Sequence, residues 1–219
     1  MSPPTVAPTD VQRSVAEARA GYDRIARVYD LLAGASERPF RAHALALLHL
    51  QPGERVLEIG CGTGEALAEL AGVTEHAVGL DLSPGMLLQA RARLDARGLH
   101  ARLMEGDAHA LPLDDHSQDA VFMSFVLDLV ASAEIPGFLA ECRRVLRPGG
   151  RMAVVAMSAD GGMRAPMALY AWAHTLFPVA VDCRPIHLRE ALDSGGFTVS
   201  TLEQGTMWGL GVAWALAQR

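Results

Sequence analysis

The residues best suited to chemistry lie in the stretch VLEIGCGTG at positions 56–64. Its first four residues are apolar except for Glu58, a composition typical of a short buried strand in a parallel sheet. Gly60, Gly62 and Gly64 then precede a run of helical composition, EALAELAGV. Glycine permits a sharp turn and lets a ligand approach the backbone where a Cβ would otherwise stand. Nucleotide-like ligands bind at such a turn between strand and helix in open α/β sheets, so the stretch predicts a site of this kind.

An acidic residue follows the next predicted strand. The strand AVGLD, residues 77–81, ends at Asp81, 17 residues after Gly64. A carboxylate at this place can accept hydrogen bonds from both hydroxyls of a ribose. Asp81 could instead cap the following helix, but Ser83 stands directly before Pro84 and is the better N-cap. The glycine turn and the acid together favour a nucleotide-type ligand.

The spacing of the glycines distinguishes two kinds of nucleotide site. A dinucleotide site has the pattern G-x-G-x-x-G, whose third glycine would fall on position 65, and this chain has Glu65 there. The pattern is instead E-x-G-x-G-x-G over residues 58–64, which resembles the first motif of the class I S-adenosylmethionine (SAM)-dependent methyltransferases. The strings YDRIARVYDLL (22–32) and RVLRPGG (144–150) resemble segments of the ubiquinone/menaquinone-biosynthesis methyltransferases. A tight strand–helix turn that binds no ligand remains the alternative for the glycines taken alone.

The resemblance implies SAM as the cofactor. It assigns Glu58 to the methionine amine, and Asp107 with the backbone N–H of Ala108 to the adenine. A similar tyrosine-containing segment closes over SAM in the family, which would place Tyr29 in a lid, although packing on the core explains Tyr29 equally well. The expected cofactor-binding residues are Tyr29, Glu58, Gly60, Cys61, Gly62, Thr63, Gly64, Asp81, Leu82, Met86, Asp107, Ala108 and Ser124.

The resemblance also implies a fold: an α/β, Rossmann-like, seven-stranded sheet of order 3-2-1-4-5-7-6 with helices on both faces. The length of 219 residues suits one domain. We expect residues 1–10 to be disordered and residues 11–219 to form a single class I methyltransferase domain. Within it, residues 11–50 would form an N-terminal helical lid and residues 158–186 an inserted helical segment at the acceptor site.

The remaining elements follow from hydrophobic pattern and turn residues. They are helices at 11–33 and 37–50, a third strand within 101–108, a fourth at 119–127, a helix at 134–147, a fifth strand RMAVVAM, a helix HLREALDSGGF, and two closing strands, FTVSTLEQ and GVAWALAQ. Trp208, between the closing strands, and Trp214, in the last one, are expected to pack against the protein. The proline and two glycines of RVLRPGG would set the start of the fifth strand.

The segment 158–186 is longer than an ordinary connection. Its residues Met163, Met167, Tyr170, His174 and Phe177 recur at helical spacing. They form either the buried stripe of a surface helix or an adaptable apolar pocket for an acceptor. No catalytic base can be assigned, because a packing or capping role explains each candidate better; the candidates are Tyr29, Asp128, His174 and His187.

The composition limits the class of partner. The formal net charge is −6 and there is no basic block, so we expect a small-molecule acceptor and no nucleic acid. No apolar run is long enough to span a bilayer and no signal pattern opens the chain, so we expect a cytoplasmic protein without an integral membrane segment. The three cysteines contain no CxxC pair, which argues against a disulfide framework and against a metal site.

Four functions compete on this evidence. The first is SAM-dependent methyl transfer to a small apolar acceptor such as a quinone precursor, a polyketide or a lipid-like molecule. A SAM-binding domain without turnover stays open, since the motifs indicate binding better than catalysis. A nucleic-acid methyltransferase is disfavoured by the sequence SFVLD after the fourth strand, and a nicotinamide-dependent oxidoreductase by Glu65. The oligomeric state cannot be read from the sequence.

Overall fold

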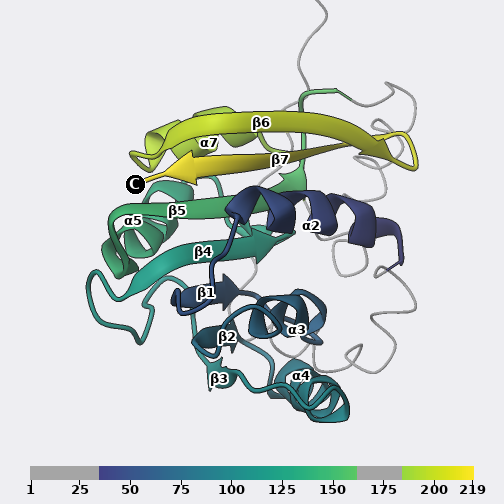
Figure 1. Ribbon diagram of the computed structural model, residues 1–219. Coiled ribbons are helices and arrows are strands. Elements are labelled where there is room, and N and C mark those ends of the chain that lie inside the picture. Colours follow the sequence, from purple (N-terminus) through teal and green to yellow (C-terminus); the bar gives the residue numbers. More distant parts are fainter. Residues whose placement is uncertain (1–34, 162–183) are drawn as a thin grey trace, which may run out of the picture.

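The computed structural model describes residues 35–161 and 184–219 (Figure 1). The expected disordered N-terminus, the helix at 11–33 and Tyr29 lie outside these residues. So does the proposed acceptor stripe, whose members are Met163, Met167, Tyr170, His174 and Phe177. Every structural statement below concerns the described part of the chain.

The core of the molecule is one seven-stranded sheet of order β3-β2-β1-β4-β5-β7-β6, which confirms the expected order. Strands β1 to β5 pair in parallel, and β7 runs antiparallel to both β5 and β6. The strands are β1 (Val56–Ile59), β2 (Ala77–Asp81), β3 (Arg102–Glu105), β4 (Gln118–Ser124), β5 (Leu146–Met157), β6 (Thr198–Met207) and β7 (Leu210–Gln218). The central strands β1 and β4 are buried along almost their whole length because both of their faces are covered.

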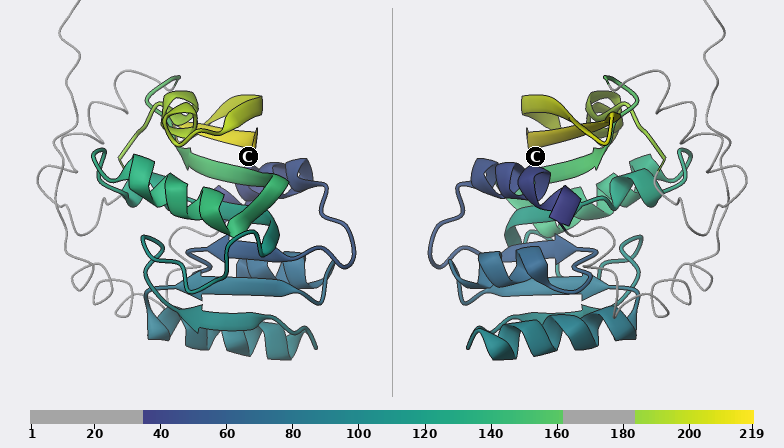
Figure 2. Two further views of the ribbon diagram at one scale, coloured as in Figure 1. Left: turned by 90° about the vertical axis from the view of Figure 1, so that its left-hand side faces the viewer. Right: turned by 90° about the vertical axis from the view of Figure 1, so that its right-hand side faces the viewer.

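Helices cover both faces of the sheet (Figure 2). They are α2 (Ala35–Leu48), α3 (Glu65–Ala71), α4 (Pro84–Ala96), α5 (Ile135–Val145) and α7 (Leu188–Ser194), with a short 3-10 turn η2 (Leu127–Leu129) after β4. Residues of α2 and α3 share one apolar core with β1, β4 and β5, and residues of α5 and α7 form the other on the opposite face. The two cores hold the sheet between them and fix the positions of its strand ends.

Several boundaries differ from those the sequence predicts. The fourth strand ends at Ser124, because the chain turns into η2 instead of continuing to residue 127. Extended structure begins at Leu146, so Pro148 and the two glycines after it lie within β5, where Gly149 has a φ of +77°. The register of β4 on β5 shifts at this point, between Gln118 and Ala120. The diglycine thus creates an irregularity at the beginning of β5.

The closing hairpin is longer than predicted and has a tip of two residues, Trp208 and Gly209. Both have positive φ, +53° for Trp208 and +81° for Gly209, as the tight hairpin turn requires. The expectation that Trp208 packs is wrong, since 70% of its surface is exposed at this tip. Trp214 in β7 is buried, as predicted, and its ring lies 5.7 Å from that of Phe40 in α2.

The register of the parallel strands brings the predicted site residues to one edge of the sheet. Ile59 pairs with Leu80 and with Met123, so Gly60, Asp81 and Ser124 follow at adjacent strand ends. Asp81 pairs with Glu105, which puts Asp107 directly beyond the neighbouring strand. The carboxyl ends of parallel strands are where open α/β sheets bind ligands.

Candidate functional site

The turn after β1 requires glycine at three places. Gly60, Gly62 and Gly64 all have positive φ, at +65°, +50° and +78°. A Cβ on Gly60 would overlap the side chain of Val126, and one on Gly64 would lie 2.9 Å from the backbone Cα of Ala90 in α4. A Cβ on Gly62 would meet nothing within 4 Å. Two glycines therefore serve close packing, whereas the surface over the middle one is open to a ligand.

Asp81 is joined directly to this turn. Its Oδ2 accepts a hydrogen bond from the backbone N–H of Gly62 at 2.8 Å, and its Oδ1 accepts one from Ser83 at 2.9 Å. The carbonyl of Leu80, one residue earlier, accepts from the backbone N–H groups of Gly60 and Cys61. The acid that the sequence assigns to a ribose is thus held against the glycine turn in one compact unit.

The helix after Asp81 has the cap that the sequence predicts. The hydroxyl of Ser83 accepts a hydrogen bond from the backbone N–H of Met86 at 3.1 Å, and Pro84 opens the helix. This cap leaves the Asp81 carboxylate at the edge of the sheet, partly exposed. Leu82 is half-buried beside it, whereas Met86 is only 2% exposed and packs inside the protein.

Glu58 is the unusual charged residue of the site. It lies inside β1, is 3% exposed, and its Oε2 has no hydrogen-bond partner among the described residues. Burial raises the pKa of its carboxyl well above the ordinary value, while the Arg41 guanidinium acts in the opposite direction. An unpartnered buried carboxylate is costly, and a cationic ligand group would relieve that cost. The residues present therefore fit a ligand that carries an amine next to a nucleoside.

Asp107 follows β3 beside Asp81, since the backbone N–H of Gly106 donates to the carbonyl of Asp81 at 3.1 Å. The Oδ1 of Asp107 accepts from the backbone N–H of His109 at 2.9 Å and lies 2.8 Å from its ring Nδ1. The ring of His109 meets that of Phe138 edge-on, with 5.5 Å between centroids. Ala108 is buried. The structure thus brings Glu58, Asp81 and Asp107 to one edge, as the pattern predicts.

Cys61 and Thr63, the residues between the glycines, are both buried. Burial raises the pKa of the Cys61 thiol well above its ordinary value, so this cysteine stays protonated and unreactive. Both residues are held inside the turn, and their expected contribution is through the backbone.

Two residues at the end of β4 depart from ordinary geometry. Phe125 has a φ of +54°, rare for a bulky residue, and its backbone N–H donates to the carbonyl of Val155 at 2.8 Å. The adjacent Ser124 has a buried Oγ without a hydrogen-bond partner in the described residues. Strained backbone beside an unpartnered hydroxyl is common at functional sites, and Ser124 lies at the expected edge of the sheet.

Two of the catalytic candidates, Asp128 and His187, lie in the described residues, and the expectation for Asp128 is wrong. Asp128 was expected to cap the next helix or orient an acceptor, but its Oδ2 accepts from the backbone N–H of Met157 at 3.0 Å and so joins the ends of β4 and β5. Asp128 is 1% exposed, and Glu134 occupies the N-cap of α5. The ring Nδ1 of His187 lies 2.9 Å from Asp160 Oδ1 at the beginning of α7. Tyr29 and His174 lie outside the described residues.

Arg41 is a site residue that the sequence reasoning missed. It belongs to α2, is 9% exposed, and its guanidinium forms an ion pair with Glu65 in the first turn of α3. A second contact, 3.8 Å long, joins it to Glu37 one turn earlier in α2. Only the fold brings Arg41 to Glu65, directly after the glycine turn and 24 residues away in sequence, so no local pattern could have revealed it.

Two further findings concern residues 35–161 and 184–219. They contain no group of three histidine, cysteine or acidic side chains arranged to hold a metal ion. None of their helices is both long and apolar enough to cross a membrane.

Comparison with known proteins gives a consistent result. Residues 56–150 match the protein family described as "Methyltransferase domain". The demethylmenaquinone methyltransferase of Tropheryma whipplei (strain Twist) is 37% identical over 151 residues, which are 67% of this chain and 61% of that protein. The chain therefore spans less than two thirds of the length of this relative.

Solved structures share the fold at lower identity. The 1,6-didemethyltoxoflavin-N1-methyltransferase of Burkholderia thailandensis superposes with a TM-score of 0.71 at 20% identity, over 97% of this chain and 94% of that one. The cyclase SpnF superposes with a TM-score of 0.73 at 18% identity, over 94% of this chain and 97% of that one.

The sheet order, the turn at residues 60–64 and the family match agree with one another. Residues 56–150 of this chain belong to the methyltransferase domain family, and the sheet around them has the strand order expected for the class I SAM-dependent methyltransferases.

Proposed function

We propose that this protein transfers the methyl group of SAM to a small apolar acceptor. The observation that carries the proposal is the unit formed by Glu58, Gly62 and Asp81. It combines an unpartnered buried carboxylate, an open backbone turn and a second carboxylate hydrogen-bonded to that turn. The buried carboxylate suits an amine, the open turn allows a ligand to approach the backbone closely, and the second carboxylate suits the hydroxyl groups of a ribose.

Each part of SAM has a proposed partner. Asp81 accepts from the ribose hydroxyls, Asp107 from the adenine amino group, and the backbone N–H of Ala108 donates to the adenine ring. Glu58 receives the methionine amine, and the open space at Gly62 lets the methionine carboxylate approach the backbone of the turn. Thr63 and Cys61 support the turn, Leu82 lies beside the adenine, and Tyr29 is proposed to close over the cofactor.

The chemistry needs positioning more than it needs a protein base. SAM supplies an activated methyl group on a sulfonium. The chain must align the acceptor atom behind that methyl, and such alignment can lower a barrier by roughly 7–11 kcal/mol. Ser124 is proposed to contact the cofactor or the acceptor at this edge, a role supported by its unpartnered hydroxyl at the end of β4. A proton acceptor is required only when the acceptor atom carries a proton that must leave.

The acceptor class is drawn from the relatives. The curated proteins similar to this chain include demethylmenaquinone methyltransferases and a ubiquinone/menaquinone biosynthesis C-methyltransferase. Their names favour a quinone precursor or a similarly apolar molecule, and the acidic balance of this chain disfavours nucleic acid. We propose that residues 158–186 shape the acceptor pocket.

A SAM-binding domain without methyl transfer is the second candidate. It is favoured by one observation: of the proposed bases, Asp128 is buried against β5 and His187 is paired with Asp160. The likeness to a cyclase also illustrates that one fold hosts different chemistries.

One experiment separates the two candidates. The protein is incubated with SAM and a panel of demethylated quinols, phenols and amines, and the release of S-adenosylhomocysteine is measured by mass spectrometry. The proposal predicts release that depends on an apolar acceptor. Binding of SAM by calorimetry together with no release for any acceptor would favour the domain without turnover, and no binding of SAM would overturn both.

A further inference from the structure

We propose that Arg144 and Glu141 of α5 act as positioning residues for the adenine contact, because they hold the chain segment that carries Asp107. The inference rests on the proposed function and deepens it. It assigns a role in base recognition to two residues of helix α5. The segment concerned, residues 107–115, connects the end of β3 toward β4 and is called the adenine segment below.

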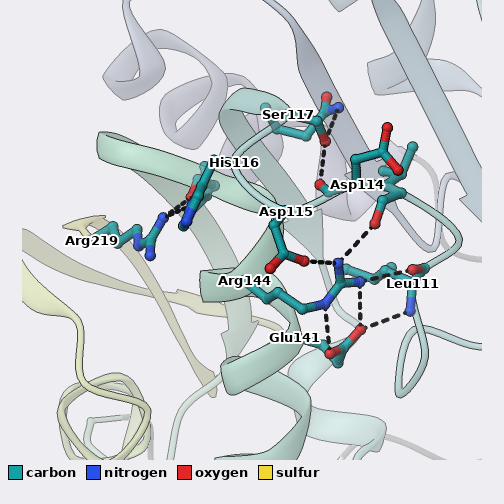
Figure 3. Close-up of polar contacts among 11 residues, drawn as sticks. Leu111, Asp114, Asp115, His116, Ser117, Glu141, Arg144 and Arg219 are labelled. Carbon is teal, nitrogen blue, oxygen red and sulfur yellow. Dashed lines mark hydrogen bonds and ion pairs between the residues drawn. The ribbon is translucent and has the colours of Figure 1, made fainter.

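Arg144 uses all five N–H donors of its guanidinium in hydrogen bonds to the adenine segment and to Glu141 (Figure 3). Its Nη2 donates to the carbonyl of Leu111 at 2.9 Å, and its Nη1 donates to the carbonyl of Leu113 at 2.8 Å and to Asp115 Oδ1 at 2.7 Å. The other two donors reach Glu141, both at 2.9 Å. A planar guanidinium with every donor engaged fixes its partners in one geometry.

Glu141 completes the hold on the adenine segment. Its Oε2 accepts a hydrogen bond from the backbone N–H of Leu111 at 3.0 Å while it also accepts from Arg144. Both backbone polar groups of Leu111 are therefore bound to α5. Leu111 is 4% exposed and lies three residues after Ala108, so the point at which α5 binds the adenine segment is close in sequence to the proposed adenine contact.

The same helix also reaches the other end of the adenine segment. Phe138 meets the ring of His109, and Glu134, just before α5, lies 3.7 Å from Nε2 of that ring. His109 in turn engages Oδ1 of Asp107 through its backbone N–H and its ring. The anchor residues Phe138, Glu141 and Arg144 follow one another at intervals of three, which places them on one face of the helix.

The charges of the anchor strengthen it. The Arg144 hydrogen bonds lower the pKa values of Glu141 and Asp115, so both carboxylates are ionised at neutral pH. Hydrogen bonds between ionised partners are shorter and stronger than neutral ones.

A second arginine of the chain provides a matched control. Arg151 donates to Glu54 at 2.9 and 2.7 Å and to the backbone carbonyls of Leu48 and His49. It therefore holds a connecting segment, residues 48–54, in the same manner, but this segment precedes β1 and carries none of the proposed cofactor residues. Loss of either arginine should affect stability, whereas only loss of Arg144 should affect recognition of the base.

The test compares two ligands that differ in the base. Calorimetry gives the dissociation constants of S-adenosylhomocysteine and S-inosylhomocysteine, in which an oxygen replaces the amino group that Asp107 is proposed to bind. In the inosyl base the ring nitrogen next to this oxygen also carries a proton, so it can no longer accept a hydrogen bond. We expect the wild type to prefer the adenosyl ligand by about tenfold or more, since at least the hydrogen bond from the amino group to a charged acceptor is lost. Arg144→Ala should reduce this preference to that of Asp107→Ala, and the double variant should show no further reduction.

The outcomes are separable. Arg144→Lys keeps the positive charge but loses the planar guanidinium and its five donors, so it should also reduce the preference for the adenosyl ligand. It replaces Arg144→Ala in the test if that variant does not fold. Arg151→Ala should keep the wild-type preference. An unchanged preference in folded Arg144→Ala and Arg144→Lys would overturn the inference, as would an equal reduction in Arg151→Ala or an unchanged preference in Asp107→Ala. Failure of the wild type to bind S-adenosylhomocysteine would overturn the proposed function itself.

Discussion

The two edges of the parallel sheet treat charge differently. At the carboxyl edge, Glu58 is buried with an unpartnered oxygen and Gly62 faces open space. At the amino edge, Arg151 is paired with Glu54, and Arg147 forms an ion pair with Asp119. These two ion pairs at the amino edge are made within the protein and favour folding, whereas the carboxyl edge retains polar groups that a ligand can satisfy.

This difference predicts which substitutions should change the stability of the protein and which should change the binding of the cofactor. Substitutions at the amino edge should lower stability and leave the cofactor site intact. Substitutions at the carboxyl edge should weaken binding, and some of them should leave stability unchanged or raise it. Four predictions test the comparison, and they are described from the largest expected effect to the smallest.

Asp81→Ala should weaken the binding of SAM by roughly 100- to 1000-fold, because it removes a charged acceptor proposed to bind two hydroxyl groups. Calorimetry with SAM measures this effect. Asp95→Ala, which removes an exposed carboxylate from the last turns of α4, is the control and should bind like the wild type. Unchanged affinity in Asp81→Ala would remove the ribose assignment.

Gly64→Ala should lower the free energy of unfolding by roughly 2–4 kcal/mol, because it adds a strained φ and a contact with the backbone of Ala90. Gly62→Ala, in open space, should lower it by only about 1 kcal/mol and yet weaken SAM binding, since the new Cβ occupies the surface over the turn. Urea unfolding and calorimetry measure the two effects. Equal destabilisation by the two substitutions would contradict the division of roles within the turn.

Arg151→Ala should lower the free energy of unfolding by about 1–3 kcal/mol, because it leaves Glu54 and two carbonyls without their partner. The Arg151 hydrogen bonds lower the pKa of Glu54, so the pair stabilises the protein above the unfolded pKa near 4.5. That contribution disappears as the pH falls through the folded pKa. Urea unfolding at several pH values should show the gap between wild type and variant closing in acid, and a gap independent of pH would argue against an ionic pair.

Glu58→Gln should raise the free energy of unfolding at neutral pH by about 1 kcal/mol while it weakens SAM binding. Burial raises the pKa of Glu58, so burying this side chain costs the wild type least below the unfolded pKa of about 4.5, where the carboxyl is protonated in both states. The wild type loses stability as the pH rises through the folded pKa. The variant should not show this loss. A variant less stable than the wild type at neutral pH would mean that the Glu58 carboxylate has a stabilising partner.

Local patterns were sufficient for the central part of the fold. The glycine turn, Asp81 and the Ser83 cap each depend on residues close in sequence, and the structure has all three where they were predicted. The order of the sheet followed from resemblance to a family and was confirmed.

Contacts between distant residues were not predictable in this way. Arg41 binds Glu65, 24 residues away in sequence, and Arg144 binds Leu111, 33 residues away. In neither pair does a local sequence pattern indicate the partner. The role of Asp128 was misjudged for the same reason, because its partner is the backbone of β5, 29 residues later. Trp208 was expected to pack, but the tight two-residue turn holds it away from the protein.

The most direct test of the central claim is a crystal structure of the protein with S-adenosylhomocysteine. The account predicts the ligand at the carboxyl edge, with both ribose hydroxyls at Asp81, the amine at Glu58 and the adenine beside Asp107. The amino edge offers a competing location, an open groove lined by residues that include Arg55, His100 and Arg102. A ligand bound there, with the glycine turn empty, would contradict the account.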